Sequence, residues 1–206
     1  MRALLALLCA AAMLSATGLA MAAPGATPDA DTAAGADVTA KVSQHVKRGE
    51  AVKVRGEVTP AQARPVTVTV NGREVGTTRS DGDGRFRLRW TPNDSGIYRV
   101  KAELADGTAS KVDTVNVYRP AQASYYGPGL YGNGTACGGR LTPSTLGVAH
   151  KTLPCGTKLT LRHRGRSVTV RVIDRGPFAG NREYDLTAAT KAKLGFGSTG
   201  TVLTTR

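Results

Sequence analysis

The feature that most constrains this 206-residue chain is a period-two alternation of apolar and polar residues, which runs from about residue 37 to 118. It is clearest in residues 85–90, where Phe86, Leu88 and Trp90 alternate with arginines. Successive side chains of a β-strand point to opposite faces of its sheet. Each alternating run therefore predicts a strand of an antiparallel sheet, with one buried face and one wet, basic face.

Turn signals separate these alternating runs. Asn71-Gly72 is typical of a two-residue hairpin, because both positions tolerate positive φ angles. About seven short strands bounded by such turns fit an immunoglobulin-like β-sandwich over residues 37–118, which resembles spacer or adhesive modules of exported bacterial proteins. The region contains no cysteine, so the predicted sandwich lacks the disulfide of antibody domains.

The N-terminal segment has the pattern of an export signal. Arg2 precedes an apolar run at residues 3–13, and residues 20–22 (Ala-Met-Ala) fit a signal peptidase site, so a signal peptide is predicted over residues 1–22. The apolar run is too short for a membrane span of about 20 residues. Residues 23–36 are small and polar, which predicts a disordered linker. We expect a secreted, extracytoplasmic protein with no transmembrane segment.

Two cysteines remain once Cys9 is removed with the signal peptide. Cys137 and Cys155 would meet an oxidising compartment, which favours a disulfide between them. The alternative is a zinc site completed by His150 or His163. Neither histidine stands at the CxxC or HxxxH spacing of known zinc motifs, so the disulfide is the favoured prediction.

The charge of the chain is basic but unevenly distributed. The formal net charge is +13; residues 123–206 hold 12 basic and 3 acidic residues, whereas residues 37–118 hold 14 and 10. For an exported protein the available polyanions are wall polymers and lipid headgroups. No basic stretch with interleaved aromatic residues indicates nucleic-acid binding. The expected partner is peptidoglycan or an anionic wall polymer, and nucleic acid is not expected.

The last part of the chain has fewer regular patterns. Residues 119–122 are expected to form a hinge, because Pro120 cannot donate to a strand ladder. A short helix is predicted with Asp185 as its N-cap and Gly195 at its end. Strand-like runs occur at residues 158–162, 167–173 and 199–204.

Three separated motifs lie in this part of the chain. They are Thr-Ala-Cys-Gly at residues 135–138, Ala-His-Lys-Thr-Leu-Pro at residues 149–154 and Asp-Arg-Gly-Pro at residues 174–177. In this order they resemble the rare lipoprotein A-like family of bacterial cell-wall proteins, which includes peptidoglycan lytic transglycosylases. The resemblance implies a six-stranded double-psi β-barrel with a short helix over residues 123–206. The predicted fold class is therefore all-β, a sandwich followed by a barrel.

The same resemblance assigns candidate site residues. It places the family's groove histidine on His150 and its aspartate on Asp174, and these two are the candidate catalytic residues. Gly139 stands where catalytic members carry an acid. The candidate substrate-binding residues are Tyr125, Tyr126, Arg175 and Asp185.

Two functions remain open on these residues. The first is an exported lytic transglycosylase, a lyase that cleaves glycan strands of peptidoglycan without water and leaves 1,6-anhydro ends. The second is a non-catalytic, expansin-like module that binds wall polysaccharide, which the missing acid at Gly139 favours. A third possibility is a secreted adhesion protein that acts through its sandwich. No cofactor or metal is expected, and a monomer is expected.

Overall fold

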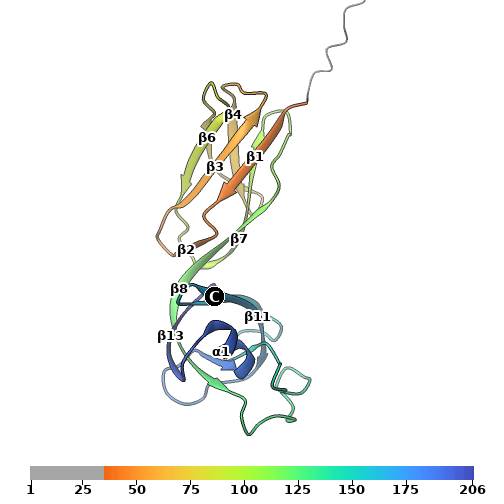
Figure 1. Cartoon of the computed structure of the whole chain (residues 1–206), viewed down its shortest axis with the longest axis vertical. Coiled ribbons are helices and arrows are strands. Elements are labelled where there is room, and N and C mark those ends of the chain that lie inside the picture. Colours follow the sequence, from red (N-terminus) through yellow and green to blue (C-terminus); the bar gives the residue numbers. More distant parts are fainter. Residues whose placement is uncertain (1–34) are drawn as a thin grey trace, which may run out of the picture. The chain divides into compact units, whose positions relative to one another are not determined.

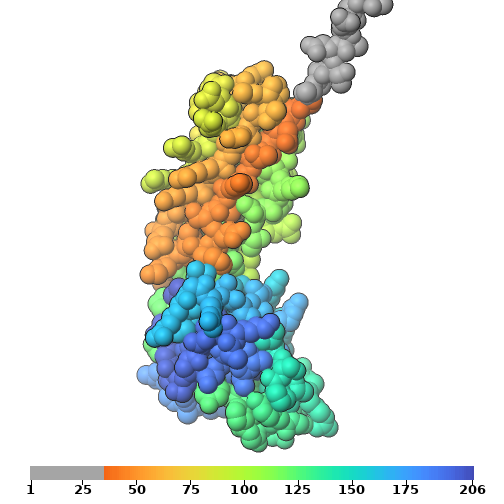
Figure 2. All heavy atoms as spheres, viewed as in Figure 1, coloured from red at the N-terminus to blue at the C-terminus, as the bar shows by residue number. Residues whose placement is uncertain are grey.

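The computed structural model describes residues 35–206, which form strands joined by turns and one short helix (Figure 1). The predicted signal peptide and nearly all of the predicted linker lie outside the described residues. No helix within residues 35–206 is long and apolar enough to cross a membrane. Figure 2 shows the same residues as a filled surface, coloured along the sequence.

The first half of the described chain forms two sheets. The first sheet has the order β1-β3-β6. The second has the order β8-β7-β4-β5, and β2 pairs with the free side of β8. The strands of the first sheet are β1 (Asp37–Val42), β3 (Val52–Thr59) and β6 (Arg85–Trp90). Those of the second are β2 (His45–Lys47), β4 (Pro65–Val70), β5 (Arg73–Arg79), β7 (Gly96–Leu104) and β8 (Asp113–Tyr126).

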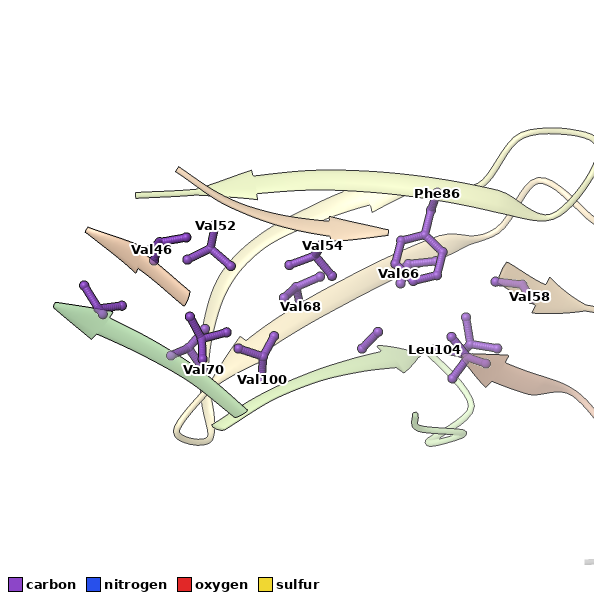
Figure 3. Close-up of a cluster of buried hydrophobic side chains, with 14 residues drawn as sticks. Val46, Val52, Val54, Val58, Val66, Val68, Val70, Phe86, Val100 and Leu104 are labelled. Atoms are coloured by element: carbon purple, nitrogen blue, oxygen red, sulfur yellow. The ribbon is translucent and has the colours of Figure 1, made fainter. Parts of the chain in front are cut away.

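The core between these two sheets is built mainly from valine (Figure 3). Val54 of the first sheet and Val66 of the second are almost fully buried, and Phe86 packs among them. Asn71 and Gly72 have φ angles of 51° and 80°, as the predicted β4–β5 hairpin requires. A sandwich of alternating strands is therefore present, whereas its immunoglobulin-like character stays a prediction.

β8 continues through the predicted hinge. Its residues 113–117 pair with β7, and its residues 119–124 pair with β13 (Thr199–Thr204). Pro120 lies opposite Leu203 with an exposed side chain. The missing N–H of one proline removes one donor from the ladder, but it does not end the strand here. Domain boundaries at residues 118 and 123 remain a prediction.

The second half of the described chain is a closed barrel of six strands. Their order is β12-β9-β11-β10-β13-β8, and pairing of β8 with β12 closes the ring. Its core includes Leu159, Leu161 and Tyr184, all fully buried. Besides β8 and β13, the strands are β9 (Val148–His150), β10 (Lys158–His163), β11 (Arg166–Asp174) and β12 (Tyr184–Thr187).

The short helix begins later than the sequence predicted. It is α1, Ala188–Leu194, and its N-cap is Thr187, whose hydroxyl accepts a hydrogen bond from the Thr190 N–H. The prediction of Asp185 as the cap was wrong, because residues 184–187 pair with β8, and residues 184–186 also pair with β9, so that they extend the barrel instead. The helix ends at Gly195 in the left-handed conformation, as predicted.

A disulfide and main-chain hydrogen bonds hold a long irregular segment between β8 and β9. Cys137 is joined to Cys155, with a Cα–Cα distance of 5.5 Å. The Cys137 N–H also donates to the Ile173 carbonyl at 3.1 Å. The disulfide therefore holds the Thr-Ala-Cys-Gly motif beside the end of β11.

Candidate active site

A β-bulge sets the direction of Asp174. β11 runs parallel to β9; Val172 pairs with Val148 and Asp174 pairs with Ala149, so Ile173 is an extra residue on β11. Val172 and Val148 both belong to the barrel core. Without the extra residue, alternation would turn Asp174 to the same side as Val172. The bulge instead turns Asp174 to the side of Ala149, away from the core.

Four neighbouring strands each place one residue in a row on this outer face, and three of the four residues are polar. Asp185 of β12 pairs with Ala149 of β9, and on its other side with Ser124 of β8. The row therefore reads Asp174, Ala149, Asp185, Ser124 across β11, β9, β12 and β8. Residues in register on neighbouring strands point to the same face. Two carboxyl groups thus flank one small residue, on strands about 10 Å apart, which is twice the spacing of neighbours.

The Asp174 carboxylate is fixed by main-chain donors. Its Oδ1 accepts hydrogen bonds from the Ala136 N–H at 2.9 Å and from the Arg175 N–H at 2.8 Å. The first bond joins β11 to the Thr-Ala-Cys-Gly motif. Two amide donors fix the orientation of the carboxylate, which suits a group that binds hydroxyls.

Asp185 has a different environment. It is half-buried, and its Oδ1 accepts a hydrogen bond from the Ser124 hydroxyl at 2.7 Å. Burial raises the pKa of Asp185, against the opposing effects of the Ser124 hydrogen bond and the Arg182 charge. A carboxyl group with a raised pKa keeps its proton more readily, as a general acid must.

Tyr126 supplies a hydroxyl near both carboxyl groups. The hydroxyl is buried and has no hydrogen-bond partner among the described residues. Burial raises the pKa of Tyr126, and the charge of Asp174, a hydrogen-bonding interaction with Asp174 and the charge of Asp185 raise it further. The hydroxyl therefore lies beside the Asp174 carboxylate.

Tyr125 is separated from Tyr126 by the alternation of β8. It packs against the barrel core, and the Lys191 ammonium lies 4.0 Å from the centre of its ring. The two tyrosines that the sequence grouped as sugar-binding therefore lie on different faces of β8. Of the two, only Tyr126 lies near the carboxyl groups.

His150 and Asp174 lie on paired strands, because Asp174 is opposite Ala149, the residue before His150. His150 is 9% exposed, pairs with Tyr184 across β9 and β12, and rests against the Tyr184 ring at a centroid distance of 5.1 Å. Its Nδ1 accepts hydrogen bonds from the N–H groups of Thr152 and Leu153, at 3.1 and 2.9 Å. Among residues 35–206, no hydrogen bond or ion pair joins His150 to Asp174.

Glu183 faces the other ring nitrogen of His150. Its Oε1 lies 3.7 Å from Nε2, and its carboxylate forms a two-pronged ion pair with Arg119. Burial lowers the pKa of His150, although Glu183 opposes this effect. Burial also acts to raise the pKa of Glu183, but the hydrogen bond and charge of Arg119 outweigh it and lower the pKa overall. His150 therefore anchors the turn after β9, within a network the sequence did not indicate.

Arg175 also binds this turn. Its guanidinium donates to the main-chain carbonyl of Leu153 at 3.0 Å, and it lies 3.2 Å from the sulfur of Cys155. These contacts tie the Asp-Arg-Gly-Pro motif to the disulfide. They place Arg175 as a support for the loop that follows β9, although the sequence suggested contact with substrate.

Gly139 lies in the turn that is tied to Asp174 through Ala136. Its φ angle is +81°, it is exposed, and a Cβ atom added to it would meet nothing within 4 Å. Space for an acidic side chain is therefore present, but the backbone favours glycine.

Aromatic side chains near the motifs are exposed. Phe178, which follows the Asp-Arg-Gly-Pro motif, is 82% exposed, and Tyr131 is 40% exposed. An exposed ring contributes little to a core, whereas it can stack on the flat face of a sugar. The exposure of Phe178 favours a role in stacking on a sugar ring.

The fold and motifs agree with comparisons to known proteins. A family model described as "Lytic transglycolase" matches residues 121–204. A probable endolytic peptidoglycan transglycosylase RlpA of Synechocystis is 45% identical over 89 residues, which are 42% of this chain and 28% of that protein. Endolytic peptidoglycan transglycosylases RlpA of Campylobacter jejuni and Neisseria meningitidis are 44% and 46% identical over 81 residues. These alignments cover 38% of this chain and 30% and 34% of the two relatives.

The closed six-stranded ring and these matches define residues 121–204 as a double-psi β-barrel of the lytic transglycosylase type. Within that class, this part of the chain belongs to the rare lipoprotein A-like family. The chain spans about a third of the length of these relatives.

Proposed function

We propose that the protein acts outside the cytoplasm on the glycan strands of peptidoglycan, as a lytic transglycosylase. The observation that carries this proposal is the row of polar residues on the outer face of the barrel, where Asp174 and Asp185 flank Ala149. The match of residues 121–204 to the family supports the substrate class.

The chemistry requires one carboxyl group to act twice. A protonated carboxyl gives its proton to the leaving glycosidic oxygen. The carboxylate so formed then takes the proton of the muramic 6-hydroxyl, which attacks the anomeric carbon and gives a 1,6-anhydro end. Asp185 suits this role because burial raises its pKa. Asp174, held by two amide donors, would bind sugar hydroxyls.

His150 and Arg175 act indirectly in this proposal. Both hold the turn after β9, through hydrogen bonds to main-chain groups of residues 152 and 153. They would position Ala149 and the disulfide loop beside the carboxyl groups. The motifs suggested instead that His150 and Asp174 are the catalytic residues, which stays a prediction.

A second function is favoured by two observations. Gly139 stands where catalytic relatives carry an acid, and an exposed Phe178 offers a stacking surface. On this basis the barrel would bind wall glycan without cleaving it, and Asp174 would bind sugar hydroxyls.

The two functions are separated by the products formed from purified sacculi. We expect mass spectrometry to detect 1,6-anhydro muropeptides with the wild-type protein. Asp185→Asn should lower their rate of formation by about 10²- to 10⁴-fold, the usual contribution of a general acid. Asp174→Asn should also lower it, whereas Asp113→Asn, a matched change in the sandwich part of β8, should not. Sedimentation with sacculi without anhydro products would support the binding function instead.

A further inference from the structure

Strands β1, β3 and β6 form one sheet of the sandwich (Figure 1), and the outer face of this sheet carries many exposed basic side chains. The inner face carries Val52, Val54 and Phe86 of the core, so the intervening side chains point outward. We call the basic face the exposed set of outward cations Lys41, Lys53, Arg55, Arg87 and Arg89.

The register of the sheet places these cations directly beside one another. Arg55 of β3 lies between Lys41 of β1 and Arg87 of β6. Lys53 lies opposite Arg89 in the next outward row. Like charges in directly opposed positions destabilise a sheet. The arrangement therefore costs stability unless a bound anion offsets it.

The five cations of the basic face are not paired with carboxylates. Among residues 35–206, none of the five forms an ion pair. Glu57, which lines the same face, pairs instead with Arg85 at 3.7 Å, and Asp37 lies at that end of the sheet, opposite Thr59. The acidic groups thus lie with Arg85 at one end of the face, and the five unpaired cations lie toward the other.

Two structural explanations do not account for the pattern. Charges on an edge strand block unwanted strand pairing, which would explain Arg87 and Arg89 on β6. It does not explain Lys53 and Arg55, because β3 is the central strand of its sheet. A face built only for solubility would mix charges of both signs.

The face also has a hollow. A groove of about 600 Å³ is lined by residues of all three strands, among them Lys41, Arg55 and Arg87. Outward residues of one strand are spaced by about 7 Å, and those opposed across strands by about 5 Å. Charges spaced in this way match a chain of anionic groups better than one isolated anion.

We propose that the basic face binds a linear phosphate polymer. Guanidinium groups bind phosphate oxygens through paired hydrogen bonds, and three of the five cations are arginines. The site is separate from the carboxyl groups of the barrel and does not depend on glycan cleavage. The basic face would give the sandwich a binding function, which the small net positive charge of this region does not indicate.

The test measures binding of inorganic polyphosphate to the full chain. The variant R55Q/R87Q/R89Q removes three charges from the basic face. The matched control, R73Q/R79Q/R99Q, removes three exposed charges from β5 and β7 of the other sheet. We expect the first variant to bind at least about 10-fold more weakly, and the control to bind within about 2-fold of wild type. The slope of log K against log salt should fall by about 2 in the first variant, at about 0.7 per lost contact.

Three outcomes would overturn the proposal. Equal weakening in both variants would show that total charge, and not this face, attracts the polymer. Equal or tighter binding of polyglutamate of the same length would replace phosphate by carboxylate as the ligand. Tighter binding of duplex DNA than of polyphosphate would assign the face to nucleic acid. Unchanged Trp90 fluorescence and a thermal midpoint no lower than that of wild type would show that each variant is folded.

Discussion

The sandwich and the barrel use the same strand alternation in different ways. In β3 and β6 the alternation is uninterrupted, so valines and Phe86 face inward and the basic face points outward. In the barrel, β9 has three residues and β12 has four, and β11 is interrupted by the bulge at Ile173. The candidate active site lies where the alternation is broken. Regular strands give a broad surface, whereas interrupted strands bring together single residues from distant parts of the chain.

The largest effect is expected from removing the disulfide, a covalent restraint that the barrel has and the sandwich lacks. The double variant C137S/C155S removes the disulfide, which joins two residues that are 18 positions apart in the sequence. The barrel should lose about 3 kcal/mol of stability, because the unfolded chain is no longer restrained. Hydrogen exchange read by mass spectrometry should rise most in β10 and β11. A similar rise in β3 and β6 would contradict the separation of the two cores.

A smaller effect is expected from restoring the missing acid. Gly139→Glu should raise the rate of anhydro product formation if the barrel is a transglycosylase that lacks one acidic group. The positive φ of Gly139 should cost about 1–2 kcal/mol of stability. Gly139→Ala carries the same strain without the carboxyl group, so only the Glu variant should gain activity. An equal change of activity in both variants would assign the effect to the backbone.

The smallest expected effects are shifts of stability with pH within the barrel. The pKa of Asp185 is raised, so its contribution to stability is complete below its unfolded pKa of about 3.9 and is lost as pH rises through the raised value. The pKa of Glu183 is lowered, so its contribution is present above its unfolded pKa of about 4.3 and is lost as pH falls through the lowered value.

These opposite trends can be separated with two variants, whose thermal midpoints are measured between about pH 3 and pH 7 and compared with that of the wild type. Relative to wild type, Asp185→Asn should gain stability as pH rises. Glu183→Gln should lose stability relative to wild type as pH rises, because only the wild type regains its ion pair with Arg119. Parallel curves for all three proteins would contradict the assigned pKa directions.

The sequence predicted the regular parts of the molecule well. Phe86 and its outward arginines follow from alternation, the hairpin from Asn71-Gly72, and the end of the helix from Gly195. The motifs of the barrel likewise identified its family from residues far apart in the chain.

The candidate site was less predictable because it depends on register. Asp185 precedes an apolar helical run and has the residue type of an N-cap, but only pairing with both β8 and β9 shows that it belongs to a strand. The direction of Asp174 depends on one extra residue, Ile173, which no sequence pattern marks. His150 occupies a motif position, yet its partners Glu183 and Tyr184 lie more than thirty residues away.

The strand β8 has a consequence for how the molecule unfolds. Its first residues complete the sheet of the sandwich, and its last residues close the barrel between β12 and β13. When the barrel opens, residues 119–126 lose their hydrogen-bond partners, and the end of the strand next to β7 loses its continuation. Fraying of the barrel therefore reaches β7 along a single stretch of main chain, whereas β3 and β6 lie in the other sheet. The cooperativity between the two halves is set by β8.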